Sequence, residues 1–327
     1  MGSITTTNGL SRPQARQAVK CGIKLSRGVY FLPAGPGEAP SLADRARAAL
    51  SVCPPGSVVC DVTALALARP RLMAELAAEA SGPVHVLVPP GSTRRPSRPG
   101  LIVHRERLMP AVWHSAPDAI SGAALAHCWA QAAARRLGAL PHPFPPRADL
   151  ASRGLFLEGS RQAFLQCVQL GDALVDRQHP LINYGHFSAH ISGLTNMRGI
   201  RAVREAFRHV RPRTDSPNET WLRLVVVDAG FPEPKVNHVV RLNQRDRFLD
   251  LGWPERKVAL EYHGAQHFTD PDQARDDVWR RGQLQAAGWI VVEAVYGDLL
   301  QPGALIGRLT AAFSGRPGNS GPGRRQF

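Results

Sequence analysis

Two apolar runs near the C-terminal end of the chain constrain its fold most strongly, because a turn separates them and each ends in a carboxylate. The first run, residues 248–250, reads Phe-Leu-Asp, and the second, residues 258–261, reads Val-Ala-Leu-Glu. Trp253-Pro254-Glu255 lies between them and is typical of a hairpin turn. The pattern therefore predicts a strand hairpin that carries Asp250 on one strand and Glu261 on the other.

The two carboxylates, Asp250 and Glu261, are candidate ligands of one divalent cation. Hard cations prefer carboxylate oxygens, and such an ion can activate water for hydrolysis. Glu261 is hard to explain otherwise, because a carboxylate that follows an apolar run is rarely buried unless it is paired or bound to metal. Asp250 has an alternative role as the cap of the turn before Trp253. His267, just past Gly264, can reach the same pocket as a proton donor.

Further motifs surround this hairpin in a definite order. A helix with an early glutamate is expected from Ser216 to Arg223, and a helix with a closing strand is expected from Asp277 to Trp289. Together with Asp250, Glu261 and the turn at Gly264, these motifs resemble the bacterial endonuclease-like domain related to the very-short-patch mismatch-repair nucleases. That domain belongs to the restriction-endonuclease-like (PD-(D/E)xK) superfamily. The resemblance covers about the last third of the chain and implies a mixed sheet flanked by helices that hydrolyses DNA with Mg²⁺ or Mn²⁺.

The resemblance also assigns roles to individual residues. It implies that Asp250 and Glu261 hold the metal ion and that His267 protonates the leaving oxygen or orients the attacking water. The remaining catalytic and DNA-contact candidates are His263, Glu219, Gln266 and Arg280. Simpler explanations remain for several of them. Glu219 can form a capping box with Ser216, Arg280 can pair with Asp277, and the histidines can be polar loop residues.

At His263 this sequence departs from the family pattern. The commoner pattern at this turn is Glu-x-Asp-Gly, whereas the third position here is histidine. A neutral imidazole supplies one nitrogen ligand and no negative charge, so a site of Asp250 and Glu261 is expected to hold Mg²⁺ weakly and to accept Mn²⁺ better. The predicted function is a metal-dependent DNA endonuclease, and the alternative is a non-catalytic DNA-binding regulator or a type IV antitoxin-like protein that keeps a degenerate nuclease fold.

The first 40 residues contain a short helix pattern followed by a basic ribbon. Residues 11–20 read as the helix, with Ser11 as its cap, and residues 23–32 read as the ribbon, with its turn near Arg27. This order resembles a truncated winged helix-turn-helix, as in the N-terminal domain of the abortive-infection antitoxins of type IV toxin–antitoxin systems. The resemblance implies that Arg16 and Arg27 contact DNA and that a cognate toxin is a partner. A purely structural cap is the alternative.

The other segments of the chain differ in composition and periodicity. Residues 41–140 read as an α/β region, 147–213 as a helical connector, 214–313 as the endonuclease-like domain and 314–327 as a disordered basic tail. Strands are expected at 84–88 and 101–105, where they can pair as a hairpin. His85 and His104 alternate with apolar neighbours on these strands, which favours an exposed face over a ligand pair. The whole chain is therefore predicted to be an α/β protein.

An excess of basic residues favours a polyanionic partner. The 327 residues include 40 Lys and Arg against 26 Asp and Glu, which gives a formal net charge of +14. Such charge is typical of proteins that bind nucleic acid, so DNA is the expected partner. Charge alone does not establish binding, because Arg-rich and Ala-rich proteins from high-GC genomes are often basic without such a partner.

Cysteine usage and hydropathy bear on the compartment. The five cysteines show no paired short spacing and their number is odd, which argues against a zinc ribbon or a disulfide framework. No apolar run approaches the ~20 residues that span a bilayer. The N-terminus lacks the apolar core of a signal peptide. A cytoplasmic protein with no membrane partner is therefore expected.

Overall fold

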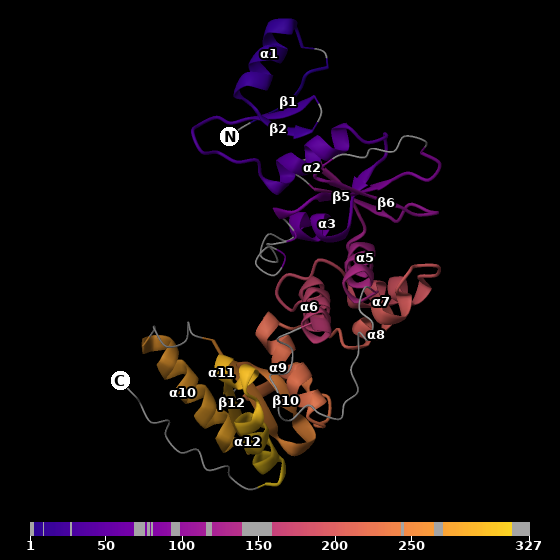
Figure 1. Ribbon diagram of the computed structural model, residues 1–327. Helices are drawn as coiled ribbons and strands as arrows, with labels where there is room; N and C mark the ends of the chain where they lie inside the picture. The colour runs from indigo at the N-terminus through magenta and orange to yellow at the C-terminus, as the bar shows by residue number, and fades with distance from the viewer. Residues whose placement is uncertain are drawn as a thin grey trace. The chain divides into compact units, whose positions relative to one another are not determined.

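The computed structural model describes residues 3–8, 10–26, 28–68, 76, 79, 81–92, 99–115, 120–138, 159–242, 245–264 and 271–315. The chain is an α/β protein, as the sequence predicted, and it forms two compact units (Figure 1). The N-terminal unit comprises Met1–Ala139 and Gly185–Arg204, and the C-terminal unit comprises Leu140–Tyr184 and Glu205–Phe327. The predicted helical connector is thus divided between the two units. None of the helices in these described ranges is both long and apolar enough to cross a membrane.

A small three-stranded sheet and one helix form the start of the N-terminal unit. The elements are β1 (Ser3–Thr6), α1 (Arg12–Cys21), β2 (Ile23–Ser26) and β3 (Val29–Leu32), and the sheet order is β1-β3-β2. The backbone amide of Ser11 donates to Oε1 of Gln14 at 3.1 Å, which caps α1. Gly28 has a φ of 75°, the left-handed conformation that the turn between β2 and β3 requires. The predicted helix and ribbon are confirmed as local structure.

A five-stranded mixed sheet forms the rest of this unit. Its strands are β4 (Val58–Val59), β5 (Val84–Val88), β6 (Leu101–Arg105), β7 (Val112–Ser115) and β8 (Ile120–Ala123), in the order β6-β5-β4-β8-β7. The helices of this part are α2 (Leu42–Ser51), α3 (Asp61–Ala68) and α5 (Leu125–Gly138). β5 is parallel to β6, so the hairpin expected for these two strands is wrong. All five residues of β5 are buried, as is common for a strand covered on both faces.

The C-terminal unit is built on a four-stranded mixed sheet. Its strands are β9 (Lys235–Leu242), β10 (Arg245–Trp253), β11 (Val258–His263) and β12 (Ile290–Val295), in the order β12-β11-β10-β9. Strands β9, β10 and β11 are antiparallel, and β11 is parallel to β12. The helices are α6 (Gly159–Leu174), α9 (Pro217–Asp228), α10 (Pro271–Ala286), α11 (Tyr296–Leu300) and α12 (Gly303–Phe313), while α7 (Tyr184–Gly193) and α8 (Ile200–Arg208) each contribute to both units. A parallel pair needs a crossover, and α10 supplies it.

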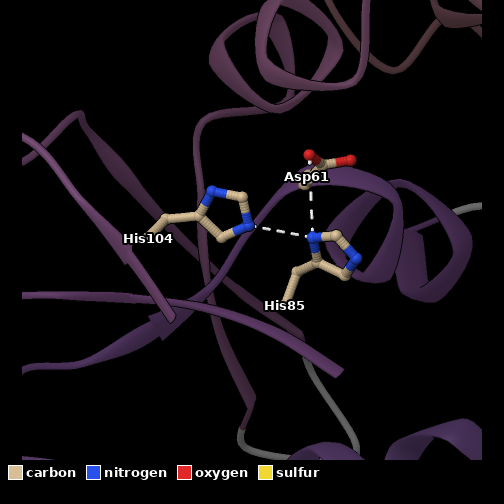
Figure 2. Close-up of side chains that lie close together, drawn as sticks. All are labelled: Asp61, His85 and His104. Atoms are coloured by element: carbon tan, nitrogen blue, oxygen red, sulfur yellow. Dashed lines mark hydrogen bonds and ion pairs between the residues drawn. The ribbon is translucent and has the colours of Figure 1, made fainter. Parts of the chain in front are cut away.

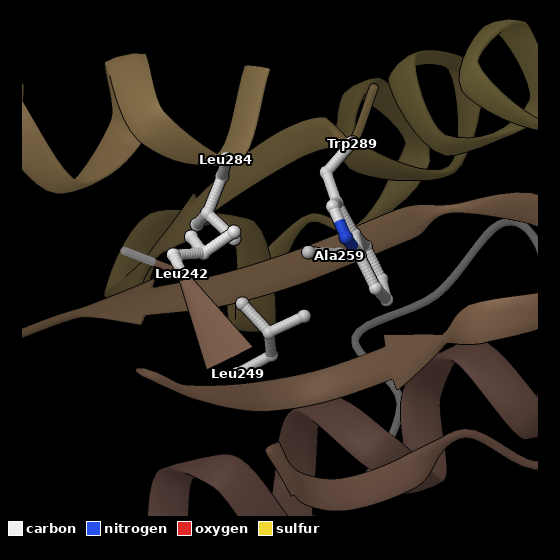
Figure 3. Packing of buried hydrophobic residues seen from close by; sticks show 5 residues of the cluster. All are labelled: Leu242, Leu249, Ala259, Leu284 and Trp289. Atoms are coloured by element: carbon white, nitrogen blue, oxygen red, sulfur yellow. The ribbon is translucent and has the colours of Figure 1, made fainter. Parts of the chain in front are cut away.

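The predicted hairpin around Pro254 is confirmed. A 3₁₀ turn, η3 (Pro254–Arg256), joins β10 to β11, and Lys257 closes it in a left-handed conformation with a φ of 48°. Behind the hairpin, Leu249, Leu284 and Trp289 pack with two further apolar residues into a buried core (Figure 3). Leu284 lies on α10, and Trp289 directly precedes β12. Their packing against Leu249 therefore fixes the crossover helix against the strands that carry Asp250 and Glu261.

Candidate functional site

Helix α9 carries the early glutamate of the C-terminal unit, and a buried ion pair holds this helix against α6. Nη2 of Arg223 donates to Oδ2 of Asp172 at 3.0 Å, and both side chains are fully buried. Oγ1 of Thr220 donates to the same oxygen at 2.8 Å. Burial raises the pKa of Asp172, while the charge of Arg223 lowers it. Since Thr220 and Arg223 on α9 bond to the same oxygen of Asp172 on α6, this network fixes the position from which Glu219 extends.

Asp250 links the two strands of the hairpin rather than capping its turn. Its Oδ2 accepts a hydrogen bond of 2.8 Å from the backbone amide of Tyr262. The ladder between the two strands ends with the pair Leu251 and Leu260, and continuing this register by one residue places Asp250 opposite Glu261. The structure thus brings the two predicted metal ligands together at one end of the hairpin.

Glu219 and Asp250 form a pair of enclosed carboxyl groups. Burial raises the pKa of Glu219 to about 8, and the negative charge of Asp250 adds to the shift. Part of Asp250 is exposed, yet burial of its carboxyl group also raises its pKa, against the effects of the Tyr262 amide and of Arg280. The amide of Asp215 donates to Oε2 of Glu219 at 3.0 Å. Two buried carboxylates repel each other when both are ionised, and a bound cation would offset that repulsion.

Glu261 is buried, with 4% of its surface exposed, and its two oxygens differ. Oε2 is paired with the guanidinium of Arg280 on α10. Within the part of the chain that the structure describes, Oε1 is buried and has no hydrogen-bond partner. A buried carboxylate oxygen without a partner costs free energy, so this oxygen is a position where a ligand would stabilise the fold.

Two histidines were predicted beside these carboxylates. His263 ends β11, and its Nε2 lies 3.5 Å from Oε1 of Glu293 on β12. It is close enough to lower the pKa of Asp250. His267 lies outside the described residues, as does Gln266.

The other predicted residues have mixed outcomes. Ser216 does cap α9, because its Oγ accepts from the amide of Glu219 at 3.2 Å, but the Glu219 carboxylate bonds to Asp215 instead of returning to Ser216. Arg16 is exposed on α1, and Arg27 lies outside the described residues. Most of the predicted basic tail, 316–327, also lies outside them.

A second polar cluster lies in the N-terminal unit, where the sequence predicted none. His85 on β5 and His104 on β6 point toward each other, with Nδ1 of His85 at 2.9 Å from Nε2 of His104 (Figure 2). Oδ2 of Asp61, at the start of α3, lies 3.6 Å from the same Nδ1. His85 is buried and His104 is half-buried. The expectation that these two histidines mark an exposed face is therefore wrong, because β5 is an interior strand whose side chains are covered.

Charged groups hold Asp61 in this cluster. Arg135 on α5 donates to both of its oxygens, from Nη2 to Oδ1 at 2.9 Å and from Nε to Oδ2 at 3.2 Å. Burial by itself would raise the pKa of Asp61, but the hydrogen bond and charge of Arg135 outweigh it and lower the pKa. Nη2 of Arg135 also donates to Glu79 at 2.7 Å. Asp61 has a φ of 52°, a strained conformation that aspartate tolerates better than most residues.

A glutamine connects this cluster to a second pair of histidines. Oε1 of Gln131 accepts from the amide of Asp61 at 3.1 Å, and its Nε2 donates to Glu106 at 2.6 Å. Glu106 also bonds to Nε2 of His127 at 2.8 Å, and Nδ1 of His127 lies 3.3 Å from Nε2 of His190. The polar network therefore extends from α3 through α5 to α7.

Asp61, His85 and His104 each place one potential metal-ligand atom within 4.8 Å of the other two. Within the described ranges, no other three residues of His, Cys, Asp or Glu do so. The sequence contained one signal of this cluster: Asp61 follows the apolar run 58–59 without a turn residue, and such a carboxylate must be paired or bound when buried. Its partners lie 24 and 43 residues further along the chain, so spacing alone did not connect them.

Comparison with known proteins finds relatives in Mycobacterium tuberculosis. They include the uncharacterized protein MT2308 of strain CDC 1551 and the uncharacterized protein Rv2248 of strain H37Rv. Each is 32% identical to this chain over 114 residues, which is 34% of this chain and 42% of the relative. The match thus spans less than half the length of each relative. No family model matches the chain, and no solved structure matches it.

Proposed function

We propose that the C-terminal unit is a metal-dependent DNA endonuclease of the very-short-patch-repair type. The observation that carries this proposal is the enclosed pair of carboxyl groups Glu219 and Asp250, together with the buried Glu261 on the strand next to Asp250. The first two repel each other where they are buried, and Oε1 of the third has no partner among the described residues. Such a group gains free energy from a divalent cation, and oxygen ligands fit Mg²⁺ or Mn²⁺.

The residues divide between holding the ion and positioning the substrate. Asp250 and Glu261 would hold the ion, and Glu219 would supply a further oxygen from α9. When bound, the ion would polarise the scissile phosphate and lower the pKa of the attacking water. Arg280 pairs with Glu261 in the described chain, and its guanidinium can turn to a phosphate oxygen once the ion neutralises that carboxylate. The role of His267 as proton donor rests on the sequence resemblance.

DNA is the proposed substrate because of charge. The chain has a formal net charge of +14, and exposed arginines such as Arg16 occur on the N-terminal helix. All five cysteines are free thiols, which supports action in the reducing cytoplasm. A toxin partner is proposed from the sequence resemblance alone.

A non-catalytic DNA-binding regulator is the second candidate. The observation that favours it is the ion pair between Arg280 and Glu261, because a fixed guanidinium can satisfy that carboxylate permanently and leave the pocket without a metal. The two candidates differ in one measurable property, since only the endonuclease requires a divalent cation to cut DNA.

A nicking assay on supercoiled plasmid tests the proposal. The full chain is incubated with EDTA, with Mg²⁺ and with Mn²⁺, alongside the variants Glu261→Gln and Glu255→Gln. Glu255 lies in the turn of the same hairpin and is exposed, so it controls for the loss of a carboxylate. Metal-dependent nicking that is lost in Glu261→Gln and kept in Glu255→Gln supports the endonuclease. DNA binding without cleavage in any metal supports the regulator.

A further inference from the structure

Three neighbouring positions in the sheet of the N-terminal unit place Asp61, His85 and His104 together. Strands β6, β5 and β4 are neighbours in the sheet in that order. His104 lies on β6 and His85 on β5, and Asp61 follows shortly after the end of β4. The amide of Cys60 donates to the carbonyl of His85 at 3.0 Å, so the residue before Asp61 is tied directly to the histidine strand. Backbone hydrogen bonds, rather than flexible loops, therefore set the spacing of the three side chains.

The geometry of the two imidazoles suits a shared ligand between them. Their ring centroids are 5.1 Å apart and their planes differ by 24°, so the facing nitrogens lie close to both ring planes. Lone pairs of ring nitrogens lie in these planes. Figure 2 shows the carboxylate of Asp61 beside the same gap, near Nδ1 of His85. One carboxylate oxygen and two nitrogens thus surround one point.

We propose that Asp61, His85 and His104 bind one Zn²⁺ ion. Two imidazoles and one carboxylate form a ligand set that zinc accepts and that Mg²⁺ and Ca²⁺ disfavour. Zinc takes nitrogen ligands at about 2.0–2.1 Å, so two such nitrogens in a tetrahedral site lie about 3.3 Å apart. The 2.9 Å between the facing nitrogens therefore needs to open by about 0.4 Å, and the rings need to turn so that both lone pairs point at the ion.

Charge in the surroundings favours a cation. Among the residues that the structure describes, the groups tied to this cluster are three carboxylates, Asp61, Glu79 and Glu106, and two guanidinium groups, Arg135 and Arg136. Asp61 keeps a lone pair for the ion, because each carboxylate oxygen can accept two bonds and Oδ2 accepts one from Nε of Arg135. Arg135 orients the carboxylate in the way that outer-shell partners orient metal ligands.

Neutral imidazole is the form of histidine that binds a metal ion, and the two rings present facing nitrogens to the site. His104 is half-buried, which gives an ion a route to the site from solvent. The three ligands leave a fourth tetrahedral position for water or a substrate atom, as in catalytic zinc sites.

Zinc titration of the full chain tests this inference. Chain freed of any affinity tag and stripped with a chelator is titrated with Zn²⁺ by calorimetry, as wild type and as His85→Ala, His104→Gln and His114→Ala. His114 is a matched control, because it lies on β7 of the same sheet and bonds to Ser121 instead of this cluster. We expect His85→Ala and His104→Gln to lower affinity at this site more than 100-fold, since even outer-shell changes cost about 10–100-fold. His114→Ala should leave this binding unchanged.

A second measurement covers the case in which the buried variants do not fold. X-ray absorption of wild-type chain loaded with one equivalent of Zn²⁺ reports the number of imidazole ligands directly. Two imidazoles with one additional oxygen ligand from protein support the site. Absence of stoichiometric binding, a signal without two imidazoles, or full binding by folded His104→Gln would overturn the inference and leave Asp61, His85 and His104 as a structural hydrogen-bonded cluster.

Discussion

The two buried polar clusters of this protein contrast in composition and in how they are stabilised. In the C-terminal unit, Glu219 and Asp250 are carboxyl groups whose pKa values are raised by burial. In the N-terminal unit, His85 and His104 have pKa values lowered by burial, and Asp61 keeps a lowered pKa because of Arg135. The first cluster gathers carboxyl groups that burial shifts toward the protonated form, while the second combines imidazole nitrogens with a carboxylate paired to Arg135.

This contrast shows that burial has opposite consequences for acids and bases. Removing water disfavours the charged form in each case, so it favours protonated carboxyl groups and deprotonated imidazoles. Oxygen-rich and nitrogen-rich clusters also prefer different ions, hard cations for the first and zinc-like ions for the second. The two proposed sites can therefore be separated experimentally within one chain.

The largest expected effect is that a variant in one cluster loses the activity of that cluster and keeps the activity of the other. Glu261→Gln should reduce nicking by more than about 100-fold, because it removes a direct metal ligand and even outer-shell changes cost 10–100-fold. His104→Gln should change the nicking rate by less than about twofold, since the two clusters belong to different compact units and share no residue. Parallel nicking and zinc-binding measurements on both variants check this. Equal loss of nicking in the two variants would contradict the assignment of separate sites.

The next effect concerns metal preference at His263. We expect wild-type chain to nick DNA faster with Mn²⁺ than with Mg²⁺, because the imidazole adds no negative charge to the site. His263→Asp should raise the ratio of Mg²⁺ to Mn²⁺ rates by about tenfold, which is about 1.4 kcal/mol. Rates in each metal at matched concentrations measure the ratio. An unchanged ratio would mean that His263 does not face the ion.

Opposite pH responses of the two units are the third prediction. In metal-free chain, Glu219 has a folded pKa of about 8, above its ordinary value near 4.5, so its contribution to stability is present below about pH 4.5 and is lost as pH rises through 8. His85 has a folded pKa of about 4, below its ordinary 6.5, so its contribution is present above pH 6.5 and is lost as pH falls through 4. Each pKa difference is worth on the order of a few kcal/mol.

Hydrogen exchange followed by mass spectrometry resolves the two units and measures this difference. Between pH 8 and pH 5, protection should rise in β10 and β11 and fall in β5 and β6, after correction for intrinsic exchange rates. Glu219→Gln should flatten the response of the C-terminal strands and leave that of the N-terminal strands. Parallel changes in both units would break the proposed contrast.

The smallest effect concerns DNA binding by the N-terminal helix. Arg16→Ala should weaken DNA binding and reduce the slope of log affinity against log salt by about 0.9, the value for one phosphate contact on duplex DNA. Arg241→Ala is the control, because Arg241 is an exposed arginine of β9 in the other unit. Fluorescence anisotropy over a salt series measures both slopes. Equal slopes for wild type and Arg16→Ala would make α1 a structural cap.

Local signals in the sequence determined much of the C-terminal site. The hairpin with Asp250 and Glu261 was predictable, because strand alternation and the turn at Pro254 depend on neighbouring residues. The cap of α9 by Ser216 was predictable for the same reason. The burial of Glu219 was not, since it depends on the ion pair of Asp172 and Arg223 between helices that are far apart in sequence.

Only the tertiary structure decided the site of the N-terminal unit. Residues 58–61 of the chain lie beside β5, and β5 lies beside β6 in a parallel pairing that no local pattern specifies. A shift of one residue in either pairing would turn its side chains to the other face of the sheet. The sequence by itself determined which strands and helices form, while the strand order and register determined that Asp61, His85 and His104 meet, because contacts between distant segments depend on the packing of the whole sheet.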